Sequence, residues 1–279
     1  MIRSSCGVID LFRFLNNACM ISNTKEDKSG SGGADGISDR GRLCTVDQVE
    51  QLKSAIRVMP IWSSTIFLAQ AMNQYFAVPQ ADAMDRRVGA GGFRVPSGTF
   101  AVFNMLTMSL WSGCYDRWTA PALRRLTGNP RGLTMKQRIG GGLVFGTAAM
   151  AAAAVVEAAR RRQALGGGGM SAFWLVPQYA LAGLAEAFGV IGVIEFFYTE
   201  LPKSMASFSM ALLYMALGAG SLVGSLIIKL VHEVSGRGGR TSWLAEDLTA
   251  GRYAYYYWHL AGLGAGNFGY FLWCGWAYG

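Results

Sequence analysis

Six long apolar runs follow a polar amino-terminal segment of the chain. The runs are continuous rather than alternating, which favours helices over strands, and each is long enough to span a bilayer. They lie at Val58–Phe76, Val95–Tyr115, Ile139–Val156, Ser171–Tyr198, Met205–Val231 and Tyr255–Tyr278. The pattern therefore predicts an all-α membrane protein in which residues 51–279 form one bundle of six transmembrane helices.

The segment before these runs has a different composition. Residues 1–50 are polar, and the stretch from Asn23 to Arg42 is rich in Ser, Gly and Asp. Such a stretch buries too little apolar surface to order itself and is typical of a flexible linker. We therefore expect a cytosolic segment that leads into a helix start at Thr45, whose hydroxyl can cap the helix.

Basic residues set the expected orientation of the bundle. They cluster in the loop after the second run, between Arg117 and Arg138. Because cytosolic loops carry an excess of Lys and Arg, we expect this loop and both termini to be cytosolic. Arg160–Arg162 oppose this orientation, since they fall in a predicted outer loop. Within the cytosolic loop, Asp116 and Arg117 are expected to latch helix ends together, although the loop could instead bind an acidic partner.

The composition excludes most classes of soluble protein. Of the 279 residues, 52% are hydrophobic and 15% are charged, whereas soluble domains carry about 25% charged residues. The net charge of +8 is spread between apolar runs, which indicates topology rather than a surface for nucleic acid. His232, His259 and the five cysteines show no spacing typical of metal ligands. We expect a multi-pass membrane protein that is not an enzyme and needs no cofactor or metal.

Three of the apolar runs carry glycines four residues apart. The pairs are Gly142 with Gly146, Gly220 with Gly224, and Gly262 with Gly266. In a membrane helix this spacing allows two backbones to approach closely. A phosphate-binding loop is disfavoured, because no strand precedes the glycines and no Gly-Lys-Ser/Thr follows them. We therefore expect these pairs to lie at helix–helix contacts.

Two carboxylates inside the fourth run are the candidates for function. A carboxylate at the centre of a bilayer costs about 2.5–3.5 kcal/mol, so intramembrane acidic residues are usually functional. Glu186 is the deeper of the two and is flanked by small residues in "GLAEAFG". Glu195 lies near the predicted cytosolic end, where it could serve transport or anchor the helix end. Nine residues separate them, so they point to opposite faces of a helix.

Several segments resemble one known family, the plant nitrate and peptide transporters. They are "TVDQVEQLKSAIRVMPIW", "QADAMDRRVG", "YDRWTAPALRRLTG", "MSAFWLVPQYALAGLAEAF", "IEFFYTELPKSM" and "YYYWHLAGL". They occur in family order and cover the chain from about Phe12 to Gly279. The family belongs to the proton-coupled oligopeptide transporters of the major facilitator superfamily, whose members hold substrate between two six-helix bundles.

The resemblance implies that this sequence is the carboxyl-terminal bundle, preceded by part of the central cytosolic loop. It lacks the family's E-x-x-E-R motif, the fifth-span signature and the fourth-span Lys that would face Glu186. Glu186 resembles a salt-bridge and proton-coupling residue of the substrate cavity. Gln70 stands where some nitrate transporters have His, which argues against nitrate. Asn73 and Asn104 are further cavity candidates, or else form hydrogen bonds to neighbouring helices.

Two functions follow from these observations. The first is a transporter of protons with nitrate, peptide or another small solute, inactive without an amino-terminal bundle or an oligomeric partner. The alternative is a non-transporting membrane protein that associates with full-length relatives and modulates them. Either protein would reside in the plasma membrane or the vacuolar membrane.

Overall fold

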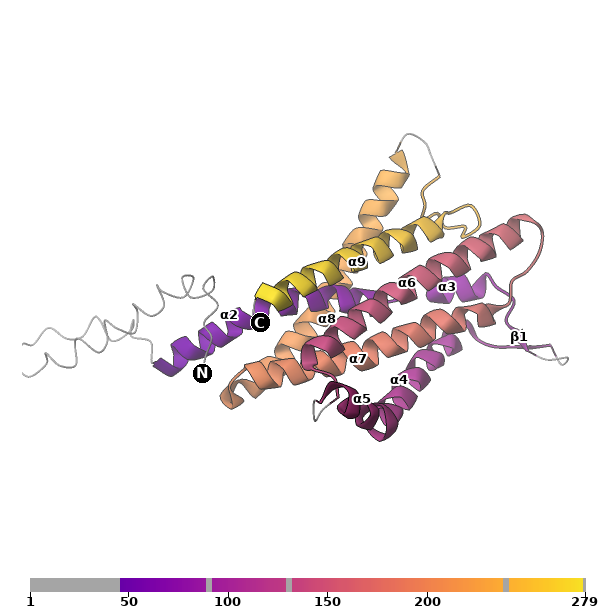
Figure 1. Cartoon of the computed structure of the whole chain (residues 1–279). Coiled ribbons are helices and arrows are strands. Elements are labelled where there is room, and N and C mark those ends of the chain that lie inside the picture. The colour runs from indigo at the N-terminus through magenta and orange to yellow at the C-terminus, as the bar shows by residue number, and fades with distance from the viewer. Residues whose placement is uncertain (1–45, 89–91, 129–131, 238–240, 278–279) are drawn as a thin grey trace, which may run out of the picture.

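The chain folds as a set of long helices packed side by side (Figure 1). This computed structural model describes residues 46–88, 92–128, 132–237 and 241–277. The predicted linker and Thr45 lie outside the described residues. The start of α2 and the end of α9 lie at the same end of the bundle (Figure 1). This arrangement suits two termini on one side of a membrane, and their placement in the cytosol stays a prediction.

All six apolar runs are helical, as predicted. The long helices are α2 (Val46–Met72), α4 (Val102–Cys114), α6 (Met135–Leu165), α7 (Val176–Glu200), α8 (Ala206–Ser235) and α9 (Tyr253–Ala277). The short elements are α3 (Ala77–Asp82), β1 (Arg87–Val88), β2 (Phe93–Arg94), η1 (Ser97–Ala101), the π-helical turn η2 (Tyr115–Thr119), α5 (Ala120–Thr127), η3 (Ala172–Leu175) and η4 (Lys203–Met205). Strands β1 and β2 pair antiparallel in a small hairpin.

Two predicted loops are helical instead. The loop expected after the second run begins with η2 and α5, so Arg117 lies on a helix and is exposed. The prediction of an outer loop at Arg160–Arg162 is also wrong, because α6 continues to Leu165. The apolar run ends at Val156, but the helix continues, and within this part Arg160 forms an ion pair with a carboxylate one turn earlier.

Three segments among the described residues are long and apolar enough to cross a membrane. They are Met135–Leu165, Ala172–Glu200 and Lys203–Ser235. The helix α4 is too short to be counted by itself, since a π-helical turn separates it from α5. The helix α9 contains many tyrosines, tryptophans and glycines and is not among these three segments. The six predicted spans therefore differ in length and mean hydropathy, although all are helical.

The helices α6 and α7 form the most extensive contact in the bundle. A Cβ atom on Gly142 would lie 2.5 Å from the Cα atom of Gly189, a distance that real side chains do not adopt. On the other side, α2 packs against α8, where a Cβ on Gly220 would lie 2.8 Å from the carbonyl oxygen of Ile66. Close packing is thus confirmed for these two glycine-bearing runs.

The third glycine pair does not lie at a contact. A Cβ on Gly262 or Gly266 would meet nothing within 4 Å in the described part of the chain. The helix α9 instead turns Gly264 toward α6, where an added Cβ would lie 2.8 Å from Oγ1 of Thr147. The prediction was wrong here because the four-residue spacing does not say which face of a helix meets its neighbour.

A substitution at Gly142 tests the contact between α6 and α7. We expect Gly142→Ala to lower the free energy of unfolding by about 1–3 kcal/mol, because the added methyl group overlaps the Gly189 backbone. Gly262→Ala is the matched control, since its methyl group has open space and alanine favours a helix. Thermal unfolding in detergent micelles measures both variants. Equal losses in the two variants would contradict the contact.

Candidate functional site

Two of the predicted site residues meet across helices α4 and α7. Nδ2 of Asn104 donates a hydrogen bond of 3.0 Å to Oε2 of Glu186, and both side chains are partly buried. Gly183 makes this contact possible, because a Cβ there would overlap the carbonyl oxygen of Asn104. Within the described chain, no Lys or Arg forms an ion pair with Glu186. The carboxyl group is therefore held by a neutral amide.

An amide partner can serve a carboxyl group in either protonation state. The Asn side chain has two N–H donors and one carbonyl acceptor. Here the amide donates to the carboxylate, while its own Oδ1 is buried and has no hydrogen-bond partner among the described residues. A half-turn of the amide would present Oδ1 to the O–H group of a protonated Glu186. The pair can therefore keep one hydrogen bond whether the carboxyl group is ionised or protonated.

Glu195 has a different kind of partner. Its Oε2 atom lies 3.2 Å from Nη1 of Arg138, at the start of α6. Nη2 of Arg138 also donates to the hydroxyl of Tyr115 at 3.2 Å, and its guanidinium lies 4.8 Å from the centre of that ring. Arginine only donates and is always charged, so it stabilises the ionised carboxylate. This geometry fits a helix-end anchor that joins α6, α7 and the π-helical turn.

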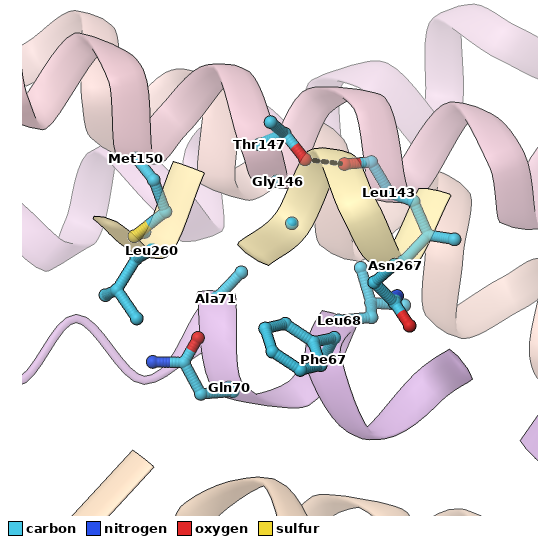
Figure 2. A pocket seen from close by; sticks show the side chains of 11 residues that line it. Phe67, Leu68, Gln70, Ala71, Leu143, Gly146, Thr147, Met150, Leu260 and Asn267 are labelled. Carbon is cyan, nitrogen blue, oxygen red and sulfur yellow. Dashed lines mark hydrogen bonds between the residues drawn. The ribbon is translucent and has the colours of Figure 1, made fainter. Parts of the chain in front are cut away.

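The remaining two candidates lie away from Glu186. Gln70 is 3% exposed and lines a cavity between α2, α6 and α9 (Figure 2). The cavity measures about 10 Å³, which is room for about one water molecule. Nδ2 of Asn73 donates to Oγ of Ser221 on α8 at 3.0 Å, so Asn73 joins two helices. The backbone N–H of Asn73 also donates to the carbonyl of Gln70 at 3.2 Å. The five predicted residues thus do not form one site, and among them only Asn104 and Glu186 bond through their side chains.

A buried ion pair on α6 was missed by the sequence reasoning. Glu157 and Arg160 are 0% and 2% exposed, and Arg160 binds both carboxylate oxygens at 2.6 and 2.8 Å. Nε2 of Gln80 donates to the same carboxylate at 2.9 Å, and Arg160 also donates to the carbonyl of Leu248 at 3.0 Å. The cluster ties α6 to α3 and to the α8–α9 loop. One sequence feature could have indicated this ion pair. A Glu and an Arg lie three residues apart after an alanine-rich stretch.

Breaking this pair should destabilise the fold. We expect Arg160→Leu to lower the free energy of unfolding by about 3 kcal/mol or more, because it leaves the Glu157 carboxylate buried without its cation. Arg162→Leu is the control, since it removes the same charge from an exposed position of the same helix. Thermal unfolding measures both. A double Glu157→Leu, Arg160→Leu variant should recover most of the loss, and a failure to recover would contradict an effect of unpaired charge.

Comparison with known proteins gives one consistent relationship. The profile of the family described as "PTR2: POT family" matches residues 15–244. The Arabidopsis thaliana protein NRT1/ PTR FAMILY 1.2 is 42% identical over 280 residues, covering 96% of this chain and 46% of that protein. NRT1/ PTR FAMILY 2.11 of the same plant is 42% identical over 267 residues, covering 91% and 43%. The chain spans about half the length of the curated relatives it matches.

Solved structures share the arrangement of helices. The in meso crystal structure of the POT family transporter PepTSo gives a TM-score of 0.64 at 20% identity, covering 84% of this chain and 43% of that one. An auto inhibited POT family peptide transporter gives 0.62 at 21% identity, covering 82% and 42%. These likenesses confirm the predicted fold class, six helices forming one bundle of a major facilitator fold.

Proposed function

The chain belongs to the POT family, and from this premise we propose that it forms the carboxyl-terminal bundle of a proton-coupled transporter. The substrate is a small solute such as nitrate or a peptide, held between this bundle and an amino-terminal one. The Asn104–Glu186 pair carries the proposal, because it joins two helices of the bundle through a carboxyl group that a neutral partner holds. The protein resides in the plasma membrane or the vacuolar membrane, which a fluorescent fusion would distinguish.

The mechanism assigns separate tasks to the carboxylates. Glu186 takes up the proton, and the amide of Asn104 turns to accept the new O–H group, so the contact between α4 and α7 persists while its charge changes. Glu195 and Glu157 form ion pairs with their arginines and have a structural task. Alternating access in such folds is a rocking of one bundle against the other around a central site. A charged carboxylate costs free energy in a site of low polarity, and protonation of Glu186 removes this cost while the bundles move.

Glu186→Gln separates proton coupling from substrate binding. The test uses a chimera of the amino-terminal half of NRT1/ PTR FAMILY 1.2 with this chain. We expect the variant to lose uphill accumulation driven by a pH gradient and to retain counterflow exchange, because glutamine keeps the volume and the hydrogen bond but cannot release a proton. Uptake of labelled nitrate and dipeptide into proteoliposomes measures both activities.

Glu195→Gln is the matched control for this test. It also removes one carboxylate from α7, but it weakens an anchor to Arg138 rather than a proton site. We expect it to lower the amount of folded protein while leaving the remaining molecules coupled. If Glu186→Gln accumulates substrate like the parent and Glu195→Gln does not, the assignment of the two carboxylates is reversed. If both variants fail only in folding, neither has a coupling role.

A polypeptide of residues 1–279 is expected to give no proton-driven uptake when expressed by itself. It supplies one bundle, and alternating access requires two that move against each other. Uptake of nitrate or a dipeptide in oocytes at acidic and neutral external pH measures this, with the chimera as positive control. A pH-dependent uptake above that of water-injected oocytes would contradict the expectation.

A further inference from the structure

The small cavity between α2, α6 and α9 has polar groups from all three helices in its lining (Figure 2). They are Gln70 of α2, Thr147 of α6 and Asn267 of α9, and the other lining residues are apolar or glycine. The volume is about 10 Å³, which is close to the smallest space that holds a water molecule. The cavity is therefore sized for one small polar ligand.

The amide of Gln70 is buried and has no hydrogen bond within the described part of the chain. The residue is 3% exposed, and no described group pairs with its side chain. An amide brings two N–H donors and one carbonyl acceptor. Leaving these groups unpaired among apolar side chains is costly, so buried polar groups nearly always have a protein or water partner. The amide therefore points to a ligand in the cavity that it lines.

The other two polar side chains supply acceptors. Oγ1 of Thr147 donates to the carbonyl of Leu143 at 2.8 Å, and its lone pairs can still accept. Nδ2 of Asn267 donates to the carbonyl of Ser64 at 2.9 Å, and its Oδ1 atom is an acceptor. The Gln70 amide adds donors. Buried water typically makes about three hydrogen bonds, and this lining offers both of the kinds that it needs.

Size and charge exclude other ligands from this cavity. Nitrate and peptides are larger than water and do not fit into about 10 Å³. A metal cation takes several oxygen ligands, usually with carboxylates among them, and no carboxylate lines the cavity in the described chain. Gln70, a candidate for the substrate cavity, thus lies at a space inside the bundle that is too small for substrate.

We propose that this cavity is an internal binding site for one water molecule, held by the Gln70 amide together with acceptors on α6 and α9. The water completes the hydrogen bonding of the polar group that α2 brings against its two neighbours. Gly264 preserves the lining, because a Cβ there would lie 2.8 Å from Oγ1 of Thr147. The site belongs to the packing of this bundle, so the proposal does not depend on transport.

Radiolytic labelling of the full 279-residue chain in detergent micelles tests for the water. X-rays convert bound water into hydroxyl radicals, which oxidise an adjacent methionine to the sulfoxide even where bulk water does not reach. Met150 lines the cavity and is 4% exposed, whereas Met84 is 6% exposed and does not line it. We expect Met150 to be oxidised severalfold faster than Met84, and mass spectrometry of peptides measures both rates.

Two variants remove the water by different means. Gln70→Leu replaces the amide with an apolar group of similar size, so we expect the oxidation of Met150 to fall to the rate of Met84. Gly146→Ala places a methyl group in the lining, where its nearest neighbour is Cβ of Ala71 at 3.4 Å, an ordinary contact. This variant takes up space rather than hydrogen bonds and should lower the oxidation of Met150 as well.

Thr65→Val is the matched control. It removes another buried polar group of α2, whose Oγ1 bonds to the carbonyl of Trp62 and does not line the cavity. We expect the oxidation of Met150 to be unchanged. Equal rates for Met150 and Met84 in the parent would overturn the proposal, and this comparison holds even if a variant does not fold. Oxidation of Met150 that stays high in Gln70→Leu, or that falls equally in Thr65→Val, would also overturn it.

Discussion

A carboxylate inside an apolar bundle needs a partner, and the partner's chemistry decides what the carboxylate can do. Three acidic side chains of α6 and α7 are buried or partly buried. Glu157 and Glu195 each contact an arginine, which can only donate and favours their ionised forms. Glu186 contacts the amide of Asn104, which can donate or accept. This difference distinguishes two ion pairs from one carboxyl group with a neutral partner.

Close helix packing is what brings Glu186 and Glu195 to their partners, whereas Glu157 and Arg160 lie on the same helix. Gly183 lets α4 approach α7, because any Cβ would overlap the carbonyl oxygen of Asn104. Gly142 and Gly189 bring α6 against α7, the pair of helices that Arg138 and Glu195 join at their ends. Small residues and interhelical polar contacts are the usual means of association between membrane helices. The site and the fold therefore rest on the same contacts.

The sequence was sufficient for the helices and for the two carboxylates Glu186 and Glu195 of α7, but not for Glu157 or for the partners of the three. Glu186 stands out because an acidic residue in an apolar run is costly, whereas its contact with Asn104 joins residues of separate helices and depends on their relative rotation. Arg160 was interpreted by its charge alone, as a loop residue. Its burial depends on Gln80 and the α8–α9 loop, which no local pattern connects to α6. The four-residue spacing likewise identified Gly142 as a contact between helices. It could not show that Gly264, rather than Gly262, faces the neighbouring helix.

The most direct test of this account is the protonation of Glu186 itself, followed by infrared difference spectroscopy of the chimeric transporter in membranes. The pH is lowered stepwise while the spectra are recorded. The account predicts a carbonyl band of a protonated carboxylic acid that is lost in Glu186→Gln and unchanged in Glu195→Gln. A band that survives in Glu186→Gln, or that disappears in Glu195→Gln, would contradict the assignment of Glu186 as the carboxyl group that carries the proton.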